Sequence, residues 1–344
     1  MAVIQYAGEF QLEECTLCTV SGLELDLTEL VADINIYEDL FSTSVSGSIS
    51  FQDNNNLLGN KDIGIIGQEK LKLKLSTPTA DDTGDRNRVI NYTETPLYVY
   101  KIDDKVGVNE NTDAFMLHFT TPEFIRNNHV RVVKSYEGEP SEDIIQNILR
   151  DDDLIASKKE FYYEVTNNHF KLVSPNMHPF NFITNLSKRC LSREYDYAPT
   201  FLFYETTKGY FFRTIDSMMD RKNPKGVYRE VSPQEIELRD NKEGVIAKLS
   251  NILNIQVMST TDTMSSRLSG MYGSRLILLD IFNKDYQEFD YNYIQDFDRD
   301  IHVDHYNRYG SSKSPVASTA TDQYGKQIGD YPDSVLHVQM IERN

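Results

Sequence analysis

Residues 44–51 read SVSGSISF, with a serine at every second position. The positions between and after the serines, Val45, Gly47, Ile49 and Phe51, carry no polar side chain. Successive side chains of a β-strand point to opposite faces, whereas a helix would spread the serines around its circumference. The stretch therefore predicts a strand with one polar face and one apolar face.

The same alternation recurs on both sides of this strand. Ile34 and Ile36 alternate with polar residues before it, and residues 70–75 read KLKLKL after it. Parallel strands need long crossover connections and are apolar on both faces. Three half-buried strands within residues 33–76 therefore predict an antiparallel sheet with one face toward water.

Two further β-rich runs follow, at residues 97–106 and 114–120. With the earlier strands they are sufficient for a small closed or layered β-structure. We expect residues 1–122 to form an N-terminal, tube-like antiparallel β-barrel.

Composition limits the possible functions of the chain. Its 344 residues are enough for two or three domains. Thirty-five basic and 53 acidic residues give a formal net charge of −18, which argues against binding of nucleic acid to a basic surface. We find no stretch of ~20 apolar residues that would span a membrane and no signal peptide. The three cysteines cannot all pair, which suits assembly in a reducing compartment.

The hydrophobic period changes after residue 122. Residues 144, 145, 148 and 149 are apolar at helical spacing, and Pro179 is a favourable first residue for a second helix, expected to reach about Arg193. Residues 200–204 and 210–215 flank a turn that ends in glycine, which is typical of a β-hairpin. Residues 123–220 are therefore expected to form an α/β domain with two helices and a hairpin.

Residues 221–344 carry a weaker pattern. We expect strands at 252–258 and 274–282, and extended or irregular structure from residue 283 onward. These strands are too few for a complete second barrel, so either a partial or irregular second β domain forms here or the chain stops before its last strands. The predicted fold class is α+β, mainly β.

Two groups of residues resemble parts of metal or redox sites. Cys15 and Cys18 have the C-x-x-C spacing, but the chain has no second pair, so we expect two small buried or half-buried residues. Residues 151–153, three consecutive aspartates, lack the alternating ligands and glycine of a calcium loop and are expected to be a solvated loop.

A third group contains two histidines. His302, Asp304 and His305 would ligate a metal only if a turn brought them together, because strand spacing separates His305 from the other two. No nucleophile elbow, zinc-protease, Walker or dinucleotide motif is present. We therefore expect no enzyme, no metal and no cofactor.

The residues 32–41, ADINIYEDLF, and 45–53, VSGSISFQD, resemble the first strands of the baseplate hub protein of contractile-tailed bacteriophages. Residues 201–212, FLFYETTKGYFF, followed by IDS at 215–217, are similar to the hairpin of that family's α/β domain. The resemblance covers roughly residues 20–220.

This resemblance implies a structural subunit of the virion. Family members are homotrimers in which each subunit gives two barrel-like domains to a ring that adapts a three-fold spike to the six-fold tail tube. The implied partners are the tail spike protein, the tail tube or tube-initiator protein and baseplate wedge proteins, with DNA only in transit and no membrane. The implied location is the tail baseplate, after assembly in the host cytoplasm. Type VI secretion spike proteins resemble the same plan.

Four serines form the candidate site. We expect Ser44, Ser46, Ser48 and Ser50 to face the lumen of the ring or a seam between subunits, because a polar wall on an acidic protein does not hold phosphates. An ordinary solvent face is the alternative. Two other functions stay open, namely an acidic hydrolase of cell-surface polysaccharide and a receptor-binding module of a secretion or tail device.

Overall fold

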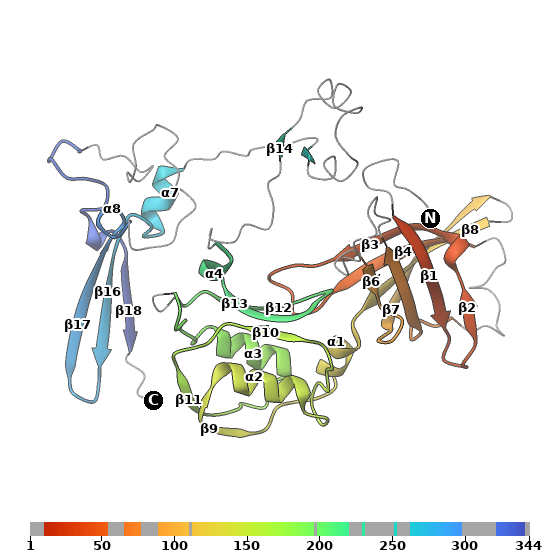
Figure 1. The fold of residues 1–344 in the computed structure, drawn as a ribbon. Helices are drawn as coiled ribbons and strands as arrows, with labels where there is room; N and C mark the ends of the chain where they lie inside the picture. The colour runs from red at the N-terminus through yellow and green to blue at the C-terminus, as the bar shows by residue number, and fades with distance from the viewer. Residues whose placement is uncertain are drawn as a thin grey trace. The chain divides into compact units, whose positions relative to one another are not determined.

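The computed structural model describes residues 10–53, 65–76, 89–109, 112–195, 198–219, 229–230, 251–252, 262–297 and 321–340. The chain forms two compact units, Met1–Met218 with Pro224–Asn254 and Met219–Asn223 with Ile255–Asn344. The first unit contains an N-terminal sheet and a part with helices and strands at residues 122–219, which we call the α/β part (Figure 1). The fold is α+β and mainly β, as predicted.

The N-terminal sheet is antiparallel throughout its described pairings. Its strand order is β2-β1-β5-β7-β8-β4-β3, with the short β6 paired to β5. The prediction of antiparallel β-structure through residues 33–76 is therefore confirmed where the structure describes them. The strands are β1 Gln11–Cys18, β2 Glu24–Asp26, β3 Val31–Tyr37, β4 Ser46–Asp53, β5 Lys70–Ser76, β6 Val89–Asn91, β7 Leu97–Asn109 and β8 Thr112–Thr120.

The two edge strands of this sheet are neighbours in the chain. β2 ends at Asp26 and β3 begins at Val31, and five peptide steps span at most about 18 Å. The sheet must therefore curl until its edges approach each other. The link holds the buried Leu27 and a 3-10 helix, η1 (Thr28–Leu30), which contacts both β1 and β4. A loop, not strand pairing, thus closes this side of a barrel-like sheet.

The non-serine face of β4 packs into the core of the sheet. Ile49 and Phe51 are buried, and the ring of Phe51 stacks on Phe115 at a centroid distance of 5.4 Å. Gly47 lies under the ring of Phe119, where a Cβ atom would be 2.3 Å from Cζ of that ring. The glycine in this alternation therefore marks a close approach of an aromatic ring to the strand.

The α/β part contains two small sheets. In the first, β13 (Gly209–Thr214) pairs antiparallel with β12 (Phe201–Thr206) and parallel with β10 (Phe161–Tyr163). In the second, β9 (Ser135–Pro140) pairs antiparallel with β11 (His169–Val173). The predicted hairpin is confirmed as β12 and β13. The helices are α1 Pro122–Asn127, α2 Ser141–Arg150, α3 Pro179–Ser187 and α4 Ile215–Met219.

Helices α2 and α3 cover the core of the α/β part. The apolar stripe predicted for α2 is fully buried, and α3 adds Phe180, Ile183 and Leu186 to the same cluster. The helix α3 is shorter than predicted, since it ends at Ser187 and the next residues form tight turns in which Cys190 N–H donates to Ser187 O at 3.2 Å. Cys190 therefore reaches the core from a turn, which extended the apolar pattern beyond the helix.

The second unit contains a three-stranded sheet in the order β17-β16-β18. β16 (Gly273–Asp280) confirms a predicted strand and pairs antiparallel with β17 (Asp285–Asn292) and parallel with β18 (Leu336–Met340). β17 falls in the region expected to be extended or irregular. It was not predicted as a strand, because most of its side chains are exposed on both faces and so carry no alternation. The unit also has α7 (Thr263–Leu268), α8 (Tyr293–Asp296) and η4 (Pro332–Ser334).

Two predicted features lie largely outside the described residues. Of the strand expected at 252–258, the structure describes Ile252, the last residue of β15 (Asn251–Ile252), which pairs parallel with β14 (Arg229–Glu230). The second candidate, the group of His302, Asp304 and His305, is not described.

Candidate assembly site at the buried Glu205 carboxylate

The carboxylate of Glu205 is buried where β12 meets the N-terminal sheet, with 1% of the residue exposed. Its Oε2 accepts the backbone N–H of Val45 at 3.0 Å and the hydroxyl of Thr121 at 2.8 Å. Val45 immediately precedes β4, and Thr121 immediately follows β8. One side chain of the α/β part therefore holds two adjacent strands of the N-terminal sheet.

Lys159 neutralises this carboxylate in part. Its Nζ donates to Oε1 of Glu205 at 2.5 Å and to Oε2 of Glu123 at 2.7 Å. Glu123 belongs to the first turn of α1, and its other oxygen accepts the hydroxyl of Ser157 at 2.9 Å. We call Glu123, Lys159 and Glu205 the ionic joint, since it brings one half-buried ammonium and two buried carboxylates together.

Burial controls the ionisation of the groups around the joint. Loss of water raises the pKa of Glu205, and the nearby Lys159 ammonium opposes that rise. Burial also raises the pKa of Tyr92 and of Tyr210, and the negative charge of Glu205 adds to both shifts. The two phenols therefore stay neutral, and Tyr210 stacks on Phe203 at a centroid distance of 5.4 Å.

The joint is suited to holding elements together, not to catalysis. All four carboxylate oxygens of Glu123 and Glu205 accept hydrogen bonds from the protein itself. A pocket of about 440 Å³ reaches Glu123 from the side of Arg126 and His129, but Lys159 and Ser157 already engage this carboxylate. A general acid or base needs an oxygen within reach of a substrate. The joint offers none.

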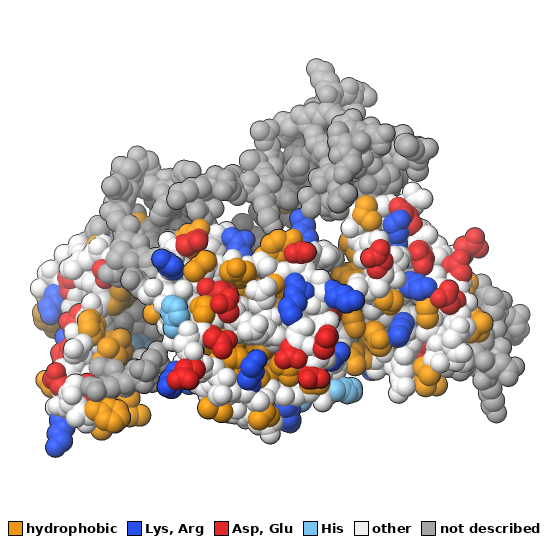
Figure 2. All heavy atoms as spheres, turned by 60° about the horizontal axis from the view of Figure 1, so that its bottom comes forward, with side chains coloured by type: hydrophobic (Ala, Val, Ile, Leu, Met, Phe, Trp, Pro, Cys, Tyr) orange, Lys and Arg blue, Asp and Glu red, His pale blue; other side chains and the backbone are white. Residues whose placement is uncertain are grey.

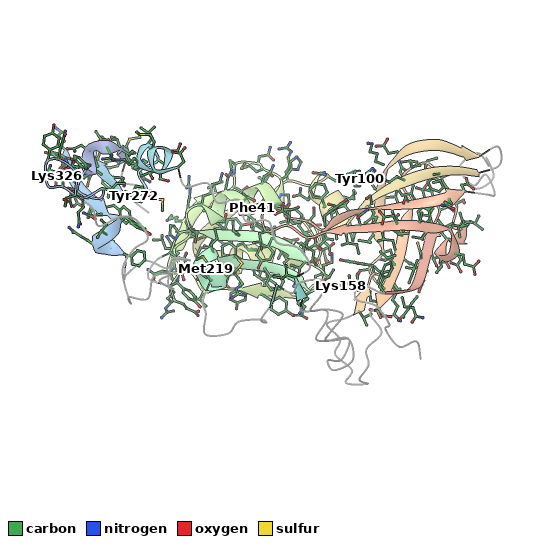
Figure 3. All side chains as sticks on the ribbon, turned by 90° about the horizontal axis from the view of Figure 1, so that it is seen from above. Phe41, Tyr100, Lys158, Met219, Tyr272 and Lys326 are labelled. Atoms are coloured by element: carbon green, nitrogen blue, oxygen red, sulfur yellow. The ribbon has the colours of Figure 1, made fainter. Side chains whose placement is uncertain are left out.

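The segment between β3 and β4 is tied to the same hairpin at both ends. Glu38 Oε1 accepts the N–H of Thr207 at 2.5 Å, and the Val45 N–H donates to Glu205. At the tip, Asp39 Oδ1 accepts the N–H of Phe41 at 2.9 Å. We call residues 38–45 the anchored loop. Figure 3 shows Phe41 alongside the α/β part, in agreement with these hydrogen bonds.

The four candidate serines lie on or just before β4. Ser46, Ser48 and Ser50 are flanked by β3 on one side and β8 on the other, where His118 is opposite Ser48. Ser44 and Ser48 are only 7% and 5% exposed, whereas Ser46 and Ser50 are half-buried. Neighbouring side chains therefore already cover two of the four within one chain, and the assignment of this face to a lumen or seam stays a prediction.

The two cysteines of the C-x-x-C spacing point to opposite faces of β1. Cys15 is buried in the core of the N-terminal sheet, and Cys18 is half-buried with its Sγ 3.7 Å from Oε1 of Glu24. An odd spacing along a strand separates two side chains in this way. The pair therefore cannot act together on one metal or in one disulfide.

The aspartate run at 151–153 forms a turn after α2, in which Asp151 Oδ1 accepts the N–H of Asp153 at 2.9 Å. Within the described part of the chain, no group of three or more His, Cys, Asp and Glu is placed to hold a metal ion.

The surface drawn in Figure 2 mixes acidic and basic side chains. No continuous basic stripe crosses that face, although the chain carries 35 basic residues. Among the residues that the structure describes, no helix has both the length and the apolar character that a membrane crossing requires.

No protein-family model and no curated protein matches this chain. Solved structures similar to it include tail and secretion proteins. The tail protein from Neisseria meningitidis MC58 is 9% identical with a TM-score of 0.46, over 96% of this chain and 72% of that protein. The 43 kDa tail protein of prophage MuSo2 from Shewanella oneidensis is 12% identical with a TM-score of 0.43, over 81% and 68%.

The E. coli c3393 protein, a component of the type VI secretion system described as similar to the T4 bacteriophage tail proteins gp27 and gp5, is also similar to this chain. It is 9% identical with a TM-score of 0.33, over 65% of this chain and 52% of that protein. At such identities and TM-scores the likeness transfers no residue role to this chain.

The ionic joint was not predicted from the sequence. One signal was present, since Phe201, Phe203 and Glu205 alternate along a strand and so place a carboxylate on the same face as two core aromatics. A charge on a core face requires a partner. Its partners Lys159 and Glu123 are 46 and 82 positions away in the sequence, and no local pattern connects them.

Proposed function

We propose that the chain is a structural subunit of a phage tail baseplate, a homotrimeric hub that adapts a three-fold spike to the six-fold tail tube. One observation carries the proposal. The two sequence segments that resemble the hub family, residues 32–53 and 201–217, are distant in the chain, and the carboxylates of Glu205 and Glu38 hold them together. The residues behind the resemblance therefore form one continuous structural feature.

A rigid connection of this kind suits a subunit of a ring. A ring transmits force from spike to tube only if the barrel-like sheet and the α/β part of each subunit keep one orientation. The joint favours one orientation, because a shift that moved one partner away would leave a buried charge uncompensated. The proposed partners are the tail spike protein, the tail tube or tube-initiator protein and baseplate wedge proteins, with DNA in transit through the ring.

The hydrolase alternative receives no support from the joint. Hydrolysis of a polysaccharide uses two accessible carboxylates on either side of the scissile bond. The two carboxylates of the joint share one ammonium, and Glu205 is closed to solvent.

Mass in solution tests the oligomeric state. Sedimentation equilibrium of the purified chain, alone and with the spike protein, should give a species of three times the monomer mass in at least one of the two samples. A monomer in both samples at micromolar concentrations would contradict the proposal.

The lumen assignment of the serine face has its own test. Ser46→Arg combined with Ser50→Arg places two cations per subunit at half-buried positions. If this face lines the lumen, the trimer should gain affinity for DNA that falls steeply as salt is raised. The control pair Ser21→Arg with Ser269→Arg adds the same charge at exposed sites. Equal gains in DNA affinity for both pairs of substitutions would count against the assignment of the serine face to the lumen.

A further inference from the structure

The anchored loop presents an apolar and acidic tip. Phe41 is 78% exposed and Leu40 is also exposed, directly after the acidic residues Glu38 and Asp39. The hydrogen bonds of Glu38 to Thr207 and of Val45 to Glu205 fix both ends of the loop. A fixed loop loses little conformational freedom when its tip is buried by a partner, so it is a favourable contact element.

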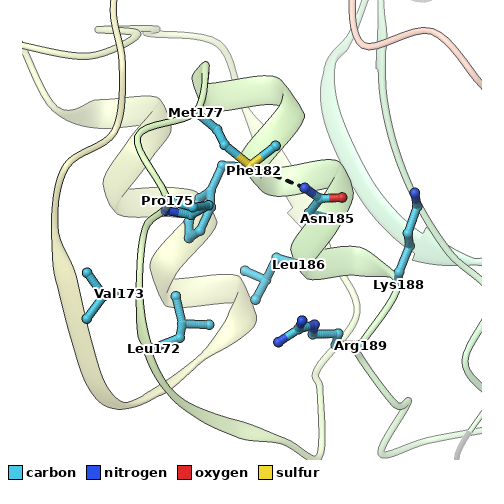
Figure 4. A pocket seen from close by; sticks show the side chains of 9 residues that line it. All are labelled: Leu172, Val173, Pro175, Met177, Phe182, Asn185, Leu186, Lys188 and Arg189. Carbon is cyan, nitrogen blue, oxygen red and sulfur yellow. Dashed lines mark hydrogen bonds between the residues drawn. The ribbon is translucent and has the colours of Figure 1, made fainter. Parts of the chain in front are cut away.

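A groove of complementary chemistry lies between β11 and α3. It has a volume of about 500 Å³, and its floor includes Leu172, Phe182 and Leu186 (Figure 4). Met177 lines it as well and accepts a hydrogen bond from Asn185, and the charged residues that line it, Lys188 and Arg189, are both basic. Methionine adapts readily to the shape of an inserted group. The groove thus suits an apolar ligand with negative charge beside it.

We propose that the anchored loop of one subunit docks into this groove on the next copy of the chain, with Phe41 and Leu40 inside and the acidic residues beside Lys188 and Arg189. The inference deepens the proposed homotrimer, on which it rests, by naming a contact between its subunits. No residue of the anchored loop lines the groove of its own chain. Loop and groove are different surfaces, so the contact runs head to tail, and such contacts form a ring when the rotation between successive copies closes.

Charge complementarity favours a second copy as the occupant. The chain carries a formal charge of −18, yet the charged lining of the groove is entirely basic. The anchored loop has the opposite charge and two large apolar side chains in succession. A stable interface buries about 1,600 Å², so the loop supplies an anchor within a wider contact surface.

Phe41→Ala tests the anchor. Truncation of a central aromatic anchor weakens each contact by roughly 30-fold. A closed trimer holds three such contacts, and its half-assembly concentration varies as the square root of the overall dissociation constant, so that concentration should rise on the order of 100-fold in sedimentation experiments. Phe282→Ala is a matched control, since Phe282 is 75% exposed and its N–H also donates to an aspartate two residues earlier, Asp280. Phe282→Ala should leave assembly unchanged. The exposed site at Phe41 makes a folding defect from the substitution small.

A groove variant completes the test. Val173→Asp places a negative charge at a 72% exposed position on the lip and should weaken assembly as Phe41→Ala does. Each variant retains one half of the contact. In a mixture, the intact loop of Val173→Asp can still enter the intact groove of Phe41→Ala, so a 1:1 dimer should form that cannot close into a ring. Circular dichroism should show that each variant is folded.

Cysteine cross-linking locates the contact directly. Phe41→Cys with Asn185→Cys, in a chain carrying Cys18→Ser, should form disulfides that link subunits into covalent dimers and trimers. The native Cys15 and Cys190 should not interfere, because both are buried. Either cysteine alone should give no covalent trimer.

The outcomes separate this inference from the proposed function. A wild-type trimer that Phe41→Ala and Val173→Asp leave unchanged, with no covalent trimer from the cysteine pair, overturns the docking contact and leaves the hub proposal standing. A wild-type chain that stays monomeric with and without the spike protein overturns both.

Discussion

Replacing Lys159 with methionine is expected to lower the free energy of unfolding by about 4 kcal/mol at pH 7. Methionine keeps much of the aliphatic length of lysine but removes the ammonium that Glu123 and Glu205 share. Two buried carboxylates then lie together without a cation, and their like charges repel each other. Urea unfolding followed by circular dichroism measures the loss, since the chain has no tryptophan for fluorescence.

The loss should shrink as the pH falls. Burial raises the pKa of Glu205 above its ordinary value of 4.5, and Lys159 opposes that rise in the wild type. A carboxyl whose pKa is raised by folding binds its proton first in the folded state, so stability is lost as pH rises through the folded pKa. Without Lys159 nothing opposes the rise in the pKa of Glu205, so the loss of stability with rising pH is larger. The difference in stability between wild type and Lys159→Met should therefore narrow from pH 7 toward about pH 4.5, and a constant difference would contradict the ionic origin.

A second substitution provides the control. Glu205→Gln keeps an oxygen to accept the Val45 N–H and leaves Lys159 paired with Glu123, so alone it should cost only about 1 kcal/mol. Combined with Lys159→Met it removes one of the two uncompensated charges and should recover about half of the lost stability. If the free-energy costs of Lys159→Met and Glu205→Gln simply add in the double variant, the three side chains of the joint do not act as a unit.

The N-terminal sheet was predictable because one of its faces is buried. The alternation at residues 44–51 and 70–75 records that burial directly, and β4 and β5 lie there. β17 has the same length as β4, but most of its side chains are exposed on both faces, so its sequence carries no alternation. β2 and β6 span only three residues each, too few to show any period.

The candidate site was predictable only in part. The pattern assigned Ser44, Ser46, Ser48 and Ser50 to one face of a strand, and the register places Ser46, Ser48 and Ser50 on β4 while Ser44 precedes it. It did not predict that Ser48 is covered, because its cover comes from β3 and β8, which are paired with β4 only in the folded chain. The ionic joint depends in the same way on residues brought together from three distant segments.

Replacing Gly47 with alanine is expected to lower the free energy of unfolding by about 3 kcal/mol. A Cβ at this position would be 2.3 Å from the backbone oxygen of Asn35 and 2.3 Å from Cζ of Phe119. The oxygen belongs to β3, which is paired with β4, so relief requires β3 and β4 to separate locally. Thermal and urea unfolding of the variant measure the effect.

The sign of the effect makes this a demanding test. In strand geometry that accepts a side chain without a clash, a change from glycine to alanine stabilises a protein by about 0.4–1 kcal/mol, because it restricts the unfolded chain. A stabilised Gly47→Ala variant would therefore contradict the close packing of Phe119 on β4. Adding Phe119→Leu removes the ring atoms but leaves the Asn35 oxygen in place, so rescue should be partial. Ser46→Ala, at the adjacent half-buried position on the opposite face, should change stability by less than about 0.5 kcal/mol.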